Sequence, residues 1–171
     1  MQGLTYVPDF ITPDQEAQLV ALIDNSKWNT SLTRRTQHYG YEYDYKSKDL
    51  KTADAIPKVF LDILQPLVKT NNYPNQVIVN EYLPGQGISK HTDASMFKDV
   101  ILSLSLLSDI NMIFRRNTDI EEKRLERRSL LVLTGDARWN WTHEIPGRKY
   151  DTVNGHKVER SRRISLTYRY V

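Results

Sequence analysis

The chain of 171 residues has the size of one ordinary domain, and its 39% apolar and 26% charged residues exclude a disordered protein. It contains no cysteine, which excludes disulfides, thiolate zinc sites and cysteine nucleophiles and leaves His, Asp and Glu as the strong metal ligands. No apolar leader or stretch of about 18 apolar residues is present, so we expect a cytoplasmic protein without a membrane span. A net charge of +3 is too small to indicate nucleic-acid binding by itself.

Two segments near the start have the apolar spacing of helices. Thr12-Pro13-Asp14-Gln15 has the form of a capping box with proline at the first helical position, which predicts a helix over 13–26. A second pattern of helical period predicts a helix over 56–69, which Pro66 kinks or ends early.

From residue 76 the pattern changes to the period of two and the β-branched residues that are typical of strands. Turn residues separate the expected strands, which are 76–82, 100–107, 111–114, 129–134, 139–143 and 163–170. The charged segment 116–128 has no apolar period, and we interpret it as a solvated connection. Short strands at this spacing predict a sandwich or barrel.

Candidate metal ligands occur in the second half of the chain. His91 and Asp93 stand two residues apart, so an extended backbone points both to one face, although this spacing also occurs in surface loops. With His143 as a third ligand they would form the facial triad of non-haem Fe(II) oxygenases, which leaves three iron positions open. His156 follows an Asn-Gly turn, where we expect an exposed hairpin tip, and His38 is interpreted as structural or substrate-side.

The last expected strand alternates strictly, with Arg163 and Arg169 on the same face. A guanidinium cannot lose its proton and needs an acceptor, so an inward face with two arginines indicates an anion such as a dicarboxylate. Asn80 and Tyr82 also share a face, and their amide and phenol can donate to a carboxylate. The alternatives are a polar face turned to water and ordinary half-buried strand residues.

A tyrosine-rich segment follows a pair of arginines. On an extended chain four phenols would lie on one side, namely those of Tyr39, Tyr41, Tyr43 and Tyr45. Aromatic faces stack bases at about 1–3 kcal/mol each, but buried tyrosines also pack over sheets. Arg34 and Arg35 are candidates for gripping phosphate, or they form an exposed pair without a ligand.

Together these motifs resemble the AlkB family of Fe(II)/2-oxoglutarate dioxygenases. The likeness covers 76–171 and is carried by Asn80-x-Tyr82-x-Pro84-Gly85, His91-x-Asp93, Gly135-Asp136-Ala137-Arg138, His143 and Arg163-x5-Arg169. It implies a double-stranded β-helix, or jelly roll, that binds Fe(II), 2-oxoglutarate and O2.

The resemblance also implies roles for the matching residues. The metal ligands, which are also the catalytic residues, would be His91, Asp93 and His143. Arg163 would pair the C5 carboxylate of 2-oxoglutarate, Arg169 would lie near its C1 end, and Asn80 and Tyr82 would add hydrogen bonds. Tyr41, Tyr43, Arg34 and Arg35 become candidates for binding the nucleotide.

We therefore expect a single α+β, mainly β domain, with N-terminal helices and a nucleotide-recognition lid over 1–75 and the jelly-roll catalytic core over 76–171. The expected function is oxidative demethylation of alkylated bases in nucleic acid, single-stranded or with a flipped-out base, by a monomer. One alternative is hydroxylation of a modified tRNA wobble uridine, because 38–43, 127–135 and 141–143 resemble that branch of the family. Further alternatives are a protein or lipid substrate, or a binding module without turnover.

Overall fold

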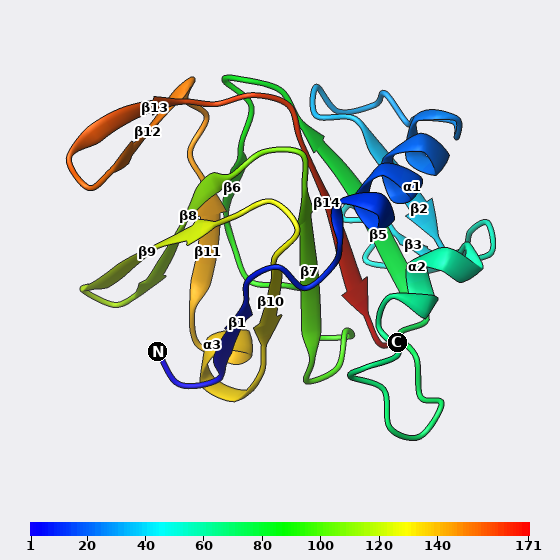
Figure 1. The fold of residues 1–171 in the computed structure, drawn as a ribbon. Coiled ribbons are helices and arrows are strands. Elements are labelled where there is room, and N and C mark those ends of the chain that lie inside the picture. Colours follow the sequence, from blue (N-terminus) through cyan, green and yellow to red (C-terminus); the bar gives the residue numbers. More distant parts are fainter.

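Two antiparallel sheets pack face to face in the computed structural model, which describes residues 1–171 (Figure 1). The strands of the larger sheet are, in spatial order, β1 (Leu4–Val7), β10 (Leu130–Leu133), β7 (Ile101–Leu106), β14 (Arg163–Arg169), β5 (Gln76–Tyr82) and β2 (Thr36–Tyr39). The smaller sheet contains β6 (Ile88–His91), β11 (Thr142–Ile145), β8 (Ile110–Arg116) and β9 (Asp119–Leu125). Two separate hairpins are β3 (Tyr41–Tyr43) with β4 (Leu50–Thr52), and β12 (Tyr150–Val153) with β13 (His156–Glu159). This arrangement confirms the expected mainly β jelly roll.

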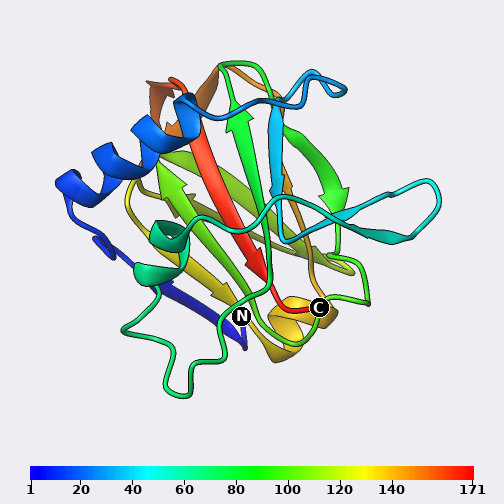
Figure 2. The same ribbon diagram turned by 90° about the vertical axis from the view of Figure 1, so that its right-hand side faces the viewer.

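Helices cover the outer face of the larger sheet (Figure 2). The helix α1 (Pro13–Asp24) begins at the predicted capping box, where Thr12 Oγ1 accepts from the Gln15 N–H at 3.1 Å and Gln15 Oε1 accepts from the Thr12 N–H at 2.8 Å. The predicted helix over 56–69 is too long, because α2 (Lys58–Asp62) ends four residues before Pro66, whose ring would clash with the Asp62 carbonyl. None of the three helices is long and apolar enough to cross a membrane.

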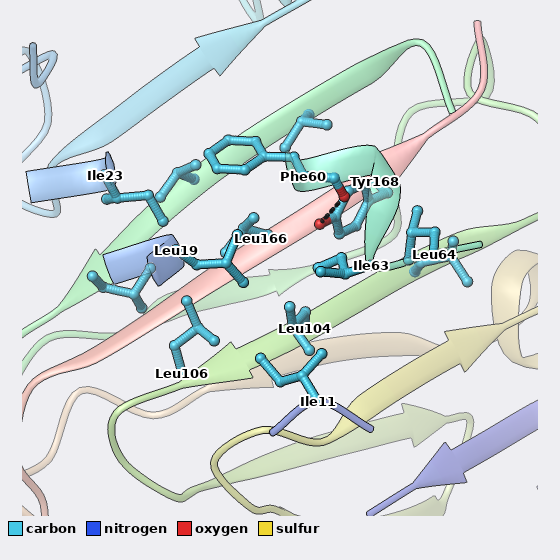
Figure 3. Close-up of a cluster of buried hydrophobic side chains, with 14 of the residues drawn as sticks. Ile11, Leu19, Ile23, Phe60, Ile63, Leu64, Leu104, Leu106, Leu166 and Tyr168 are labelled. Carbon is cyan, nitrogen blue, oxygen red and sulfur yellow. Dashed lines mark hydrogen bonds between the residues drawn. The ribbon is translucent and has the colours of Figure 1, made fainter. Parts of the chain in front are cut away.

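The strand β14 has two buried faces, in the middle of the larger sheet. Its apolar face packs against the helices, where Leu166 and Tyr168 lie beside Phe60 and the Tyr168 hydroxyl donates to the Phe60 carbonyl at 2.8 Å (Figure 3). Its polar face points between the sheets, and Arg163 and Arg169 are only 1% and 6% exposed. The predicted alternation is confirmed, and the alternative of a polar face in water is wrong.

The charged segment 116–128 is not a solvated connection, as the sequence pattern suggested, because most of it forms β9. This strand pairs with β8 from Ile110↔Leu125 to Arg116↔Asp119 and lies at the edge of the smaller sheet. An edge strand takes its backbone hydrogen bonds from one neighbour and exposes most of its side chains, so it needs no apolar period. Only Leu125 within β9 is buried.

Two other expectations about strands need correction. The predicted strand over 139–143 begins later, because a short helix, α3 (Gly135–Trp139), precedes it and β11 runs from Thr142 to Ile145. The first 75 residues supply β1 and β2, the two edge strands of the larger sheet, so they build the jelly roll as well as cover it.

The expected row of four phenols is interrupted at Gly40. This glycine has φ +77° and lies so close to Asn75 that a Cβ would be 2.1 Å from the Asn75 carbonyl oxygen. The chain turns there, and Tyr39 packs in the core with its ring 5.4 Å from that of Phe60. Tyr43 instead contacts Tyr45, with ring centres 4.8 Å apart.

We predict that Gly40→Ala destabilises the fold much more than Gly155→Ala. Both glycines have φ +77°, so each alanine meets left-handed strain of about 1–2 kcal/mol, but nothing lies within 4 Å of a Cβ at Gly155. Denaturant unfolding should show about that loss for Gly155→Ala and at least about twice that loss for Gly40→Ala. Equal losses would contradict the tight turn at Gly40.

Candidate active site

Three potential metal ligands meet at one end of the smaller sheet. His91 is the last residue of β6, Asp93 follows it by two, and His143 on β11 is the register partner of His91. Their ligand atoms all lie within 4.8 Å of one another, and His143 Nε2 is 3.4 Å from Asp93 Oδ1. The pairing of β6 with β11 therefore brings the predicted triad together across fifty residues of sequence. Neither His38 nor His156 belongs to this cluster.

Hydrogen bonds, burial and nearby charges favour the binding of a cation by these side chains. His91 Nδ1 lies 2.7 Å from the Ser89 carbonyl oxygen, which can only accept, so Nδ1 donates to it and Nε2 is the ring nitrogen that could bind a metal. Burial lowers the pKa of the His143 imidazole to about 4, against the attraction of Asp93, and thus keeps it neutral. Burial alone would raise the pKa of the Asp93 carboxyl, but Arg169 and the two imidazoles lower it to about 2. One nitrogen from each of two imidazoles and one carboxylate oxygen form a ligand set that suits Fe(II).

Two buried arginines hold Asp93. Arg169 Nε donates to Asp93 Oδ2 at 2.7 Å, which orients the carboxylate and leaves its other oxygen toward His143. Arg138, which is 2% exposed, fixes the following loop by donating to main-chain carbonyls. Its acceptors, at 2.7–3.1 Å, are the carbonyls of Asp93, Ala94, Phe97 and Lys98.

A pocket between the sheets extends from the triad to Arg163, and Asn80 and Tyr82 line it. Arg163 Nη2 donates to Ser105 Oγ at 2.8 Å, but Nε and Nη1 are buried with no partner. Burial lowers the pKa of Arg163 to about 10, so the guanidinium is still charged at neutral pH. A buried cation with unused donors needs an anion, and a carboxylate is a suitable acceptor. The donors and charges that line the pocket therefore suit a dicarboxylate, with a metal ion at one end and Arg163 at the other.

The two arginines expected to bind phosphate have different partners in the fold. Arg34 lies at the edge of the pocket, where its Nε donates to Oδ1 of the lining residue Asn80 at 3.0 Å. Arg35 forms two hydrogen bonds of 2.8 Å with Glu81 and stacks on Trp28, with its guanidinium carbon 4.5 Å from the ring centre. The guanidinium of Arg35 thus already has partners within the protein.

The tyrosines expected to bind a base lie on the β3–β4 hairpin. The Tyr43 ring centre is 5.8 Å from that of Phe97, and Phe97 in turn packs against the guanidinium of Arg169 at 4.5 Å. Tyr41 is half-buried and pairs with Thr52 in the hairpin. Tyr43 is therefore linked by packing to the arginine that holds Asp93.

Two residues of the site had no predicted role. Ser105 supplies the one hydrogen bond that the Arg163 side chain makes within the protein, and its signal is the polar alternation of Ser103 and Ser105 in the apolar strand β7. Arg138 stands in the motif Gly135-Asp136-Ala137-Arg138, but its partners are main-chain carbonyls. No sequence pattern indicates such partners.

Comparisons with known proteins agree with this geometry. The family model of the 2OG-Fe(II) oxygenase superfamily matches residues 21–169. An uncharacterized protein, L905, of Acanthamoeba polyphaga mimivirus is 38% identical over 100% of this chain and 86% of its own length. The "Alkylated DNA repair protein ALKBH8 homolog" of Arabidopsis thaliana is 37% identical over 99% of this chain, which spans 58% of that protein.

A relative from Xenopus tropicalis, "tRNA (carboxymethyluridine(34)-5-O)-methyltransferase alkbh8", is 36% identical over 99% of this chain, which spans 32% of that protein. Among solved structures, OsALKBH1 superimposes with a TM-score of 0.77 at 17% identity, covering 99% of this chain and 97% of that one. The structural likeness supports the fold, and the sequence matches support the family. The chain belongs to the 2OG-Fe(II) oxygenase superfamily, as an AlkB-type dioxygenase that uses Fe(II), 2-oxoglutarate and O2.

Proposed function

We propose that the chain oxidises an alkylated base in nucleic acid, with His91, Asp93 and His143 as the iron ligands. The observation that carries the proposal is the pocket that joins this triad to the unpaired donors of Arg163. That pocket offers three potential metal ligands at one end and a fixed positive charge at the other. 2-Oxoglutarate has a keto acid for the first and a carboxylate for the second.

The proposal assigns a role to the residues at each end of the pocket. Arg163 binds the C5 carboxylate, and its burial keeps competing water away from the ion pair. Asn80 and Tyr82 donate to the bound carboxylate, while Arg169 keeps Asp93 ionised and oriented as a ligand. When bound, Fe(II) would supply the redox chemistry by which one O2 oxidises both 2-oxoglutarate, to succinate and CO2, and a carbon on the substrate.

The substrate side of the proposal is the β3–β4 hairpin. Tyr43 lies against Phe97, which packs on Arg169, so a base stacked on this hairpin would be close to the iron ligands. Tyr41 belongs to the same hairpin, and Arg34 is held nearby through its hydrogen bond to Asn80. We leave Arg35 out of the proposed substrate site because Glu81 and Trp28 already engage it.

A second candidate is hydroxylation of a modified uridine at the tRNA wobble position. The name of the Xenopus relative refers to a carboxymethyluridine of tRNA, and that protein is 36% identical over nearly the whole of this chain. The products distinguish the two reactions. A hydroxylated N-methyl group leaves as formaldehyde, whereas a hydroxylated methylene keeps its hydroxyl.

The experiment that tests the function uses a panel of methylated DNA, methylated RNA and total tRNA. Each is incubated with the protein, iron, ascorbate and 2-oxoglutarate, and the nucleosides are analysed by mass spectrometry. We expect loss of a methyl group from one substrate, or a gain of one oxygen on a tRNA uridine for the second candidate. Succinate formed at the same rate with and without every nucleic acid would favour a protein or another substrate.

We predict that Tyr43→Ala lowers base oxidation more than it lowers succinate formation. The iron ligands are unchanged in this variant, so 2-oxoglutarate is still consumed while the base is misplaced. Tyr150→Ala, which removes an exposed tyrosine from the β12–β13 hairpin, is the control and should change neither product. An equal loss of both products in Tyr43→Ala would point to a folding role for Tyr43.

We predict that His91→Ala and His143→Ala each weaken Mn(II) binding at least tenfold, since each removes one of three ligands. Calorimetric titration measures the affinity, and circular dichroism verifies the fold. His156→Ala at the exposed hairpin turn should bind Mn(II) as the wild type does. Tight binding by His143→Ala with a loss in His156→Ala would overturn the ligand assignment.

We predict that Arg163→Lys lowers the affinity for 2-oxoglutarate at least tenfold, which corresponds to about 1.4 kcal/mol. An ammonium is a compact donor that cannot reproduce the planar fork of a guanidinium. Arg162→Lys is the matched control, because Arg162 pairs with Asp24 and Glu81 outside the pocket. Unchanged affinity in Arg163→Lys would place the carboxylate elsewhere.

A further inference from the structure

Arg34 contacts two groups at the edge of the pocket without lining it. Its Nε donates to Asn80 Oδ1 at 3.0 Å, and its Nη1 donates to the Gly87 carbonyl at 3.3 Å. The guanidinium carbon also lies 5.7 Å from the centre of the Tyr82 ring. The pairing of β2 with β5, in which Thr36 is opposite Asn80, brings Arg34 to this position.

The contact with Arg34 decides which end of the Asn80 amide is free. An amide has one accepting oxygen and one donating nitrogen, whereas a guanidinium can only donate. A flipped Asn80 would therefore face Arg34 with a second donor and lose the hydrogen bond. In the observed orientation Nδ2 makes no hydrogen bond within the protein, although Asn80 is 5% exposed and lines the pocket.

Arg34 is itself held from the other side. The Gly87 carbonyl that accepts from Nη1 belongs to a closely packed segment, because a Cβ at Gly87 would lie 2.1 Å from the Ile145 carbonyl oxygen. The guanidinium thus connects a rigid backbone point to a side chain of the pocket. Its position is defined by these contacts without any ligand.

We propose that Arg34 is a positioning residue, which orients the Asn80 amide so that Nδ2 faces the carboxylate of 2-oxoglutarate. The inference rests on the proposed function, because it assumes that 2-oxoglutarate occupies this pocket. It gives Arg34 a different role from a phosphate contact. A positioning role affects the affinity for the cosubstrate, whereas a phosphate contact affects the affinity for nucleic acid.

The test is a double-mutant cycle in 2-oxoglutarate binding, measured by calorimetry on the Mn(II)-loaded protein without O2. We expect Arg34→Met and Asn80→Ala each to weaken binding about three- to tenfold, the range of one hydrogen bond. The double variant should bind no more weakly than Asn80→Ala alone, because Arg34 acts through Asn80. Arg34→Gln keeps an N–H donor for Oδ1 and should recover part of the affinity.

Controls separate this role from a general loss of charge or fold. Arg35→Met removes the neighbouring charge, whose partner Glu81 keeps Arg162, and should leave the 2-oxoglutarate affinity unchanged. Mn(II) affinity should also be unchanged in Arg34→Met and Arg34→Gln. If Arg34→Met does not fold, Arg34→Gln in the same cycle decides the question.

Three results would overturn the proposal for Arg34. In the first, the fold-losses of 2-oxoglutarate affinity in Arg34→Met and Asn80→Ala multiply in the double variant. In the second, Arg34→Gln binds 2-oxoglutarate as weakly as Arg34→Met. In the third, Arg34→Met loses affinity only for a single-stranded oligonucleotide. Failure of the proposed function would give different results from failure of this role for Arg34. In that case the Mn(II)-loaded wild type would bind no 2-oxoglutarate, or Arg163→Lys would bind it normally.

Discussion

The charge of Arg163 lies in the interior with two nitrogens, Nε and Nη1, that have no acceptor, and the site is organised around it. Burying an ion without a partner costs several kcal/mol, and only the Ser105 hydroxyl offsets part of that cost. An anion that binds in the pocket reduces this cost, because it accepts hydrogen bonds from the guanidinium. The cost of burying the Arg163 charge without an acceptor therefore favours the binding of a dicarboxylate.

The strand β14 can carry this charge because its other face stabilises the fold. Leu166 and Tyr168 are buried among the side chains of α1 and α2 on one side of the sheet (Figure 3). Arg163 and Arg169 are buried on the other side, where they line the pocket between the sheets. Neighbours on both edges, β5 and β7, fix the strand in register. One strand thus connects the hydrophobic core, the end of the pocket at Arg163 and the proposed metal ligand Asp93.

The features that the sequence predicts well are those in which one local pattern decides the outcome. Such a pattern determines where a side chain points or what it bonds to. Examples are the alternation of β14, the capping box at Thr12 and the spacing of His91 and Asp93. The errors arise where backbone interactions decide. An edge strand such as β9 needs no apolar period, and the turn at Gly40 depends on its close approach to Asn75. The partners of Arg34 and Arg138 depend on strand register and on main-chain carbonyls, which no local pattern records.

The most direct test of the role of Arg163 is a crystal structure of the protein with Mn(II) and 2-oxoglutarate, grown without O2. Mn(II) accepts the same octahedral ligands as Fe(II) but does not start the reaction. The predicted result is a metal bound by His91, Asp93 and His143 and a carboxylate oxygen within hydrogen-bond distance of the Arg163 guanidinium. A structure in which 2-oxoglutarate binds elsewhere, and water alone contacts Arg163, would contradict it.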